Sequence, residues 1–174
     1  MFDLISYITN MFKHFFIILI SFTVSISTAL ADKSMKIGKK GKQEDVTRII
    51  NVLMYDNYFE PSSFTVQPGE TIKFEVENVG ELVHEFNIAN QTMHKDHQSE
   101  MQKLVEMEII LADSIDKMSM MDKSMAHSHA NSVLLEPKKS KDLIWKFENA
   151  SNIEIACNVP GHYDVGMIAK VEIN

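Results

Sequence analysis

Apolar and polar residues alternate along several short stretches of the chain, with the two-residue period of a β-strand that buries one face. In residues 71–77, Ile72, Phe74 and Val76 alternate with polar neighbours, which predicts a half-buried antiparallel strand. About seven or eight short strands between turns are typical of an all-β Greek-key sandwich, which is the fold that we expect. Comparable stretches predict the other strands at residues 49–55, 64–66, 82–88, 143–147, 153–157 and 167–173.

The pattern changes between residues 90 and 131, where apolar residues recur every three or four positions. This period is that of a helix with one apolar face. Ser99 and Gln102 have the spacing of a capping box, which predicts the start of the helix. We therefore expect a helical insertion at residues 90–131 within the β domain. The apolar positions that define it are Met101, Leu104, Met107, Leu111, Ile115 and Met118.

The beginning of the chain has the features of an export signal. Residues 15–26 form an uncharged apolar run, shorter than the roughly 20 residues that span a bilayer. Small residues follow at Ala29 and Ala31, the spacing that signal peptidase reads. We predict a signal peptide at residues 1–31 that is cleaved after Ala31, and hence a periplasmic protein with no stable membrane insertion. The alternative is an uncleaved membrane anchor. The residues around Met11 also favour that methionine as the start of translation.

The segment after the predicted cleavage site differs in composition from the rest of the chain. Residues 32–46 contain five lysines and two glycines but few apolar residues. This composition is typical of a solvated segment without a core of its own. We therefore expect a flexible basic arm at residues 32–46, followed by a single domain at residues 47–174.

The composition of the whole chain narrows the classes of function. Its 17 basic and 24 acidic side chains give a formal net charge of −7, which argues against a nucleic-acid partner. A single cysteine cannot form an internal disulfide, yet an exported protein meets an oxidising environment. The thiol must therefore be buried or bonded to another group. Twelve methionines and seven histidines supply abundant sulfur and nitrogen ligands for metals.

The single cysteine belongs to a Cys-x4-His-x4-Met segment, in which Cys157, His162 and Met167 lie on one loop after a predicted strand. Copper sites combine a thiolate and two imidazoles in a trigonal plane with a weak axial thioether. His84 is the best candidate for the second imidazole, because strands that end at one pole of a sandwich can lie side by side. We therefore predict a mononuclear copper site from these four residues. Gly166 should let the loop turn tightly before the methionine.

A zinc site and a catalytic thiol are two alternatives to a copper site for the residues of this loop. Zinc binds Cys and His, but structural zinc sites are completed by Cys, His or carboxylate and do not use Met. Cys157 and His162 could also form a thiol nucleophile and its base. That role would leave His84 and Met167 without a function. We therefore expect a metal-binding protein and not an enzyme.

At these residues the sequence resembles the cupredoxins, the blue-copper proteins, and most closely the small periplasmic cupredoxins associated with copper tolerance. The resemblance covers the chain from Arg48 to the C-terminus. Its matching motifs lie at residues 68–71, 84–86 and 157–167.

The resemblance implies a cofactor and a function. One type 1 copper ion would be held by His84, Cys157, His162 and Met167 and would cycle between Cu(II) and Cu(I). The family's usual function is one-electron transfer to a redox protein partner, with His162 as the exit for the electron. Its copper-tolerance members handle excess periplasmic copper. Simple electron carriers of the family lack the long insertion, which puts a plain shuttle role in doubt.

The insertion contains histidines and methionines on both sides of the predicted helix. Thioether and imidazole groups suit Cu(I), which prefers soft ligands. We therefore hypothesise a second copper site, through which the protein would sequester or relay copper instead of acting as a redox shuttle. The alternative is that these side chains pack on the helix or are solvated. The candidate ligands are His94, His97, Met101, Met125, His127 and His129.

Overall fold

The computed structural model describes residues 37–120, 129–148 and 152–174 of the chain. These residues belong to one compact unit. The predicted signal peptide and its cleavage site lie outside them. Among the described residues, no helix has both the length and the apolar composition that crossing a membrane requires.

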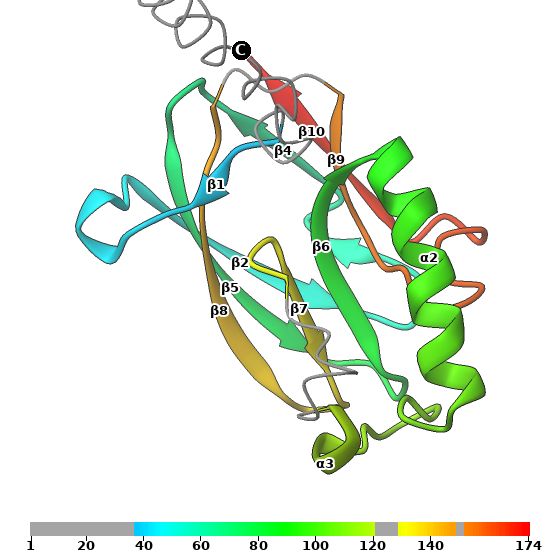
Figure 1. Cartoon of the computed structure of the whole chain (residues 1–174). Helices are drawn as coiled ribbons and strands as arrows, with labels where there is room; N and C mark the ends of the chain where they lie inside the picture. Colours follow the sequence, from blue (N-terminus) through cyan, green and yellow to red (C-terminus); the bar gives the residue numbers. More distant parts are fainter. Residues whose placement is uncertain (1–36, 121–128, 149–151) are drawn as a thin grey trace, which may run out of the picture. The chain divides into compact units, whose positions relative to one another are not determined.

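The described residues form a sandwich of two five-stranded sheets, so the predicted all-β architecture is confirmed (Figure 1). The strand orders are β1-β8-β5-β2-β3 in the first sheet and β4-β10-β9-β6-β7 in the second. The first sheet contains β1 (Lys39–Lys40), β8 (Ser140–Lys146), β5 (Thr71–Asn78), β2 (Arg48–Met54) and β3 (Phe59–Glu60). The second contains β4 (Ser63–Val66), β10 (Ile168–Ile173), β9 (Ile153–Ala156), β6 (His84–Asn90) and β7 (Ser132–Leu135).

Most of the predicted strands are present within one or two residues of their expected bounds. The strand predicted at residues 71–77 is antiparallel to β8 but parallel to β2, so its predicted orientation holds on one side only. A parallel pair also joins β4 to β10. The sequence does not predict β1, β3 or β7, because each is too short to establish a pattern of alternation.

The alternating apolar side chains of both sheets meet in one core. Phe74 from the first sheet lies with its ring centroid 5.2 Å from that of Phe86 in the second. Phe59 and Phe147 are also buried and contact these two rings edge-on. Burial of these large apolar surfaces is the main force that holds the two sheets together.

Part of the predicted basic arm is paired with the first sheet. Lys39–Lys40 pair with Lys146 and Trp145 of β8, and the indole of Trp145 donates a hydrogen bond of 2.9 Å to the carbonyl of Ile37. A short 3-10 helix follows at Gln43–Asp45. The expectation of a flexible segment is therefore wrong for these residues. Lysines are well suited to an edge strand, because their backbone pairs while their charged ends stay in solvent.

The insertion begins with a long helix, but not where the sequence predicted it. α2 (Gln91–Glu106) starts directly after β6, and the side chain of its N-cap, Asn90, accepts a hydrogen bond from the amide of Met93. The predicted cap at Ser99 is therefore wrong. The helix ends before Glu108, whose φ of 57° is incompatible with a continuing helix. The apolar spacing continues past this turn, so it does not locate the end of α2.

A second, smaller hydrophobic cluster attaches the insertion to the sandwich. Met101 and Leu104 of α2 pack with Ile109 and Ile110 from the following loop and with Val83, which precedes β6. The amide of Val83 also donates to the carbonyl of Ala112 at 2.7 Å. α2 lies alongside β6 in Figure 1 and contacts both β6 and β9. The insertion therefore covers the region next to His84. The short helix α3 (Lys117–Met120) follows it.

Candidate metal centre

Three strands of the second sheet bring the predicted ligands to one pole of the sandwich. His84 is the first residue of β6, Cys157 directly follows β9, and Met167 directly precedes β10. Ala156, the last residue of β9, is paired with Asn87 of β6 on one side and with Ile168 of β10 on the other. The antiparallel registers therefore place residues far apart in the sequence side by side.

Three of the predicted ligand atoms converge. Nδ1 of His84 lies 3.1 Å from Nδ1 of His162, and Sγ of Cys157 lies 3.3 Å from Nδ1 of His162 and 3.9 Å from Nδ1 of His84. Nitrogen and sulfur donors that share one ion at bonds of 2.0–2.3 Å lie within about 4.5 Å of each other. The separations thus fit a single bound metal ion.

Met167, the predicted fourth ligand, is fully buried next to these residues. Its amide donates to the carbonyl of His162 at 3.0 Å, and its carbonyl accepts from the amide of Cys157 at 3.2 Å. These two backbone hydrogen bonds hold the methionine against the first residue of the loop, Cys157, and against its middle residue, His162. The backbone of Met167 therefore lies beside Cys157 and His162, and its role as the fourth ligand stays a prediction.

The loop between Cys157 and Met167 is closed by its own backbone. The amide of His162 donates to the carbonyl of Val159 at 3.0 Å, and the amide of Gly166 donates to the carbonyl of Tyr163 at 2.9 Å. Gly166 has a φ of 91°, in the left-handed region that a residue with a Cβ adopts only at a cost. The predicted tight turn before Met167 is therefore present, and its backbone conformation favours glycine.

Hydrogen bonds from outside the loop orient two of the predicted ligands. Oδ1 of Asp56 lies 3.1 Å from Nε2 of His84, and the same oxygen accepts the amides of Glu81 and Leu82. The amide of Glu85 donates to Sγ of Cys157 at 3.3 Å. Asp56 comes from the β2–β3 connection, far from His84 in the sequence, so no local pattern identifies its role.

The protonation states of the predicted ligands follow from their burial. Burial raises the pKa of the Cys157 thiol to about 12. Burial also lowers the pKa of His84 and of His162. The nearby His84 lowers the pKa of His162 further, to about 4. At neutral pH the imidazoles are therefore already neutral and able to bind a metal. The thiol binds only after a metal displaces its proton.

The residues predicted to form a second copper site are only partly brought together. His97 and His129 lie close, with ring centroids 5.1 Å apart, and Glu100 lies between their nitrogens. His94 instead contacts Asn158 through its Nδ1 at 3.2 Å. Met101 is buried in the smaller hydrophobic cluster. The other two candidates, Met125 and His127, lie outside the described residues.

A buried carboxylate connects the region of His97 to the predicted copper ligands around Cys157. Glu85 is 1% exposed, and its Oε1 lies 2.9 Å from Nε2 of His97. Its other oxygen accepts a hydrogen bond of 2.8 Å from the side chain of Asn158, the residue after Cys157. The sequence signal for this role is a charged residue within a strand that is buried on both faces.

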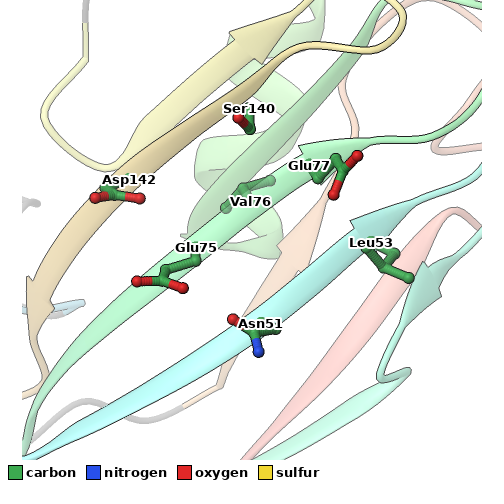
Figure 2. Close-up of a pocket in the computed structure, with 7 residues that line it drawn as sticks. All are labelled: Asn51, Leu53, Glu75, Val76, Glu77, Ser140 and Asp142. Atoms are coloured by element: carbon green, nitrogen blue, oxygen red, sulfur yellow. The ribbon is translucent and has the colours of Figure 1, made fainter.

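Two hollows of the surface differ in chemistry. One, with a volume of about 360 Å³, includes His162 and is otherwise mostly apolar. Its lining residues are Leu82, Val83, Val105, Ile110, Leu111, Ala112, Val159, Pro160 and His162. The other lies on β2, β5 and β8, where the carboxylates of Glu75, Glu77 and Asp142 gather (Figure 2). It contains none of the predicted copper ligands.

The family of the chain follows from comparison with known sequences. Residues 15–113 match the cupredoxin-like domain family, a span that includes His84 and ends before Cys157. The copper-resistant cuproprotein CopI of Pseudomonas aeruginosa is 37% identical over 150 residues, which cover 78% of this chain and 81% of that protein. CopI of Vibrio cholerae is 24% identical over a match that covers 90% of this chain and 97% of that protein. The chain therefore belongs to the cupredoxin family. Within it, the chain is related to copper-tolerance proteins.

Solved structures agree with the fold. Auracyanin B superposes with a TM-score of 0.57 at 13% identity, covering 79% of this chain and 96% of that one. Reduced auracyanin from Roseiflexus castenholzii superposes with a TM-score of 0.52 at 18% identity, covering 74% of this chain and 97% of that one. Copper is the cofactor that the family and the cluster of His84, Cys157 and His162 support. Cupredoxins are in general copper-binding proteins and not enzymes.

Proposed function

We propose that this chain is a mononuclear type 1 copper protein whose ion is held by His84, Cys157, His162 and Met167 and cycles between Cu(II) and Cu(I). The observation that carries the proposal is the convergence of two imidazole nitrogens and one thiol sulfur within 4.8 Å of one another. The backbone bonds of Met167 to Cys157 and His162 support it as the fourth ligand.

The bound ion supplies a one-electron change, and the residues of the chain hold its donors in place. Asp56 fixes the orientation of His84, and the amide of Glu85 stabilises the sulfur of Cys157 as a thiolate. The closed loop restrains His162. Donors that are held in this way move little between the two oxidation states, which favours rapid electron exchange.

An enzymatic role for Cys157 has little support. A catalytic thiol needs a lowered pKa, because the thiolate is the nucleophile. Burial instead raises the pKa of this thiol to about 12, which keeps it protonated at neutral pH in the absence of metal. We therefore propose a binding protein.

The surface beside His162 supports electron exchange with a protein partner. His162 lines the mostly apolar hollow, together with Leu111, which is 50% exposed. Exposed apolar surface next to a functional residue is typical of a contact with another protein. The ligand His162 would then be the exit for the electron.

A second candidate function is the handling of excess copper in the periplasm. It is supported by the relatives named as copper-resistant cuproproteins and by the proximity of His97 and His129 in the insertion. In this function the protein would sequester the ion or pass it on. The predicted export signal at residues 1–31 supports the location.

The copper assignment is tested by adding Cu(II) to the purified mature protein. We expect an intense visible absorption from thiolate-to-copper charge transfer, which disappears in Cys157→Ser while far-UV circular dichroism shows that the variant is folded. A colourless complex of the unaltered protein would overturn the assignment.

The two functions are separated by a substitution in the apolar hollow. Leu111→Glu should slow electron self-exchange between oxidised and reduced protein, and Met107→Glu is the control, because Met107 is exposed but does not line the hollow. If electron transfer underlies tolerance, cells that carry Leu111→Glu also become more sensitive to copper. Slow self-exchange with unchanged tolerance would favour copper handling.

A further inference from the structure

Three side chains with metal-binding atoms meet between α2 and the segment before β7. His97 and Glu100 are three residues apart on α2 and therefore share a face of the helix. Nδ1 of His97 lies 3.1 Å from Oε2 of Glu100, and Nε2 of His129 lies 3.6 Å from the same oxygen. One ligand atom from each residue falls within 4.8 Å of the others. These separations fit donors that share one ion.

The inner histidine of this cluster is held in the orientation that a metal requires. Nε2 of His97 lies 2.9 Å from the carboxylate of Glu85, which is itself 1% exposed. A histidine that donates one ring N–H to a carboxylate presents the lone pair of its other nitrogen to a metal, and such pairs are common around bound metals. Nδ1 of His97 faces the carboxylate of Glu100, and a metal that displaces the proton between them would bind at this nitrogen.

We propose that His97, Glu100 and His129 form a second metal site, distinct from the type 1 site, that binds Cu(II). Two imidazoles and a carboxylate are nitrogen and oxygen donors, which suit Cu(II) and Zn(II) better than the soft ion Cu(I). Copper binds such donors more tightly than zinc does in the series of divalent metals. The thioether of Met101 is fully buried in the smaller hydrophobic cluster, and the proposed site does not include it.

The exposure of the three ligands indicates how the ion enters. The side chain of His97 is 9% exposed, whereas those of Glu100 and His129 are 54% and 43% exposed. One ligand is anchored in the protein and two reach the solvent. The site is therefore open to exchange of the ion, unlike the buried cluster around Cys157.

The test uses the mature protein with one equivalent of Cu(II) already bound, to which further Cu(II) is added. We expect a second equivalent to bind without additional thiolate-to-copper absorption and with the electron paramagnetic resonance spectrum of copper held by nitrogen and oxygen. The double variant Glu100→Gln/His129→Ala should weaken this second equivalent at least tenfold and leave the first unchanged. Both altered residues are exposed, so the fold should be retained.

Glu106→Gln is the matched control, because Glu106 is exposed on the same helix outside the cluster. It should bind the second equivalent as the unaltered protein does. A stoichiometry that stays at one, or a second equivalent that is unchanged in the double variant, would overturn the proposal. Tighter binding of Zn(II) than of Cu(II) would overturn its assignment to copper. The result does not depend on the type 1 site, because Cys157→Ser should retain the second ion.

Discussion

A single oxygen of Asp56 organises one side of the proposed copper site. It accepts the amides of Glu81 and Leu82 at 2.8 and 3.2 Å and lies 3.1 Å from Nε2 of His84. Burial alone would raise the pKa of Asp56, but these hydrogen bonds lower it, so the carboxylate is charged at neutral pH. A charged acceptor at Nε2 leaves Nδ1 of His84 as the nitrogen that faces Cys157 and His162.

Removal of this acceptor should weaken copper binding. Asp56→Ala is expected to lower the affinity for Cu(II) about 10–100-fold, the usual effect of losing a partner that orients a metal-bound histidine. Asp56→Asn is the matched control, because its side-chain oxygen still accepts from Nε2 and should retain most of the affinity. Competition with a chelator of known affinity measures both, and equal affinities for Asp56→Ala and the unaltered protein would contradict the role of Asp56.

Gly80 allows Asp56 to approach His84. A Cβ at Gly80 would lie 2.3 Å from Oδ1 of Asp56 and 3.1 Å from Nε2 of His84. Gly80→Ala should therefore displace the carboxylate and lower copper affinity in the same direction as Asp56→Ala. Gly69→Ala is the control: a Cβ there would meet no atom within 4 Å, and the φ of 84° makes the substitution costly to stability without moving any residue of the proposed site. It should leave affinity unchanged in the same competition assay, whereas an unaffected Gly80→Ala would count against this packing argument.

At the scale of elements, packing of apolar side chains attaches the insertion to the sandwich. Met101 takes part in this packing, with Leu104 on the same helix and Val83 next to the proposed ligand His84. Loss of a buried side chain of this size leaves a cavity, because the surroundings relax only in part.

Met101→Ala is therefore expected to lower the free energy of unfolding by about 2–5 kcal/mol. Met107→Ala is the control, since Met107 is 55% exposed and its truncation should cost little. Urea unfolding of the metal-free proteins measures both. If the two variants have the same stability, the smaller cluster does not hold the insertion to the sandwich.

The elements differ in how far the sequence predicts them. Alternation identifies strands such as β5 and β10, because each buries one face, and local spacing identifies the loop from Cys157 to Met167. The start of α2 is not predicted, because Asn90 ends β6 and caps the helix at the same time. Contacts between distant residues, such as that of Asp56 with His84, have no local signal and require the folded sandwich.

At the scale of the whole molecule, the fold determines how stability depends on pH. The pKa of His162 falls from 6.5 in the unfolded chain to about 4 in the metal-free folded protein, mainly through burial. Between these values the unfolded chain binds more protons than the folded protein. The free energy of unfolding should therefore fall as the pH drops from about 6.5 towards 4.

His162→Gln tests this dependence, because it removes the titrating group. The metal-free variant should lose less stability between pH 7 and pH 5 than the unaltered protein does, as measured by urea unfolding at both values. His84 has a lowered pKa and contributes in the same direction, while His97 has a raised pKa and contributes in the opposite one. Both are present in the two proteins, so they largely cancel in the comparison. Parallel pH profiles would contradict the prediction.

Glu85 has a consequence for how the two proposed metal sites would affect each other. Its backbone amide contacts the sulfur of Cys157, and its carboxylate contacts the ring of His97. A displacement of this one residue changes the surroundings of both. Any coupling free energy between the two ions is reciprocal, so a copper ion on His97 alters the affinity at Cys157 by the same factor as the converse. The occupancy of the exposed site at His97 would depend on the copper concentration in the surrounding solution. A change in this occupancy would in this way adjust the copper affinity of the buried site at Cys157.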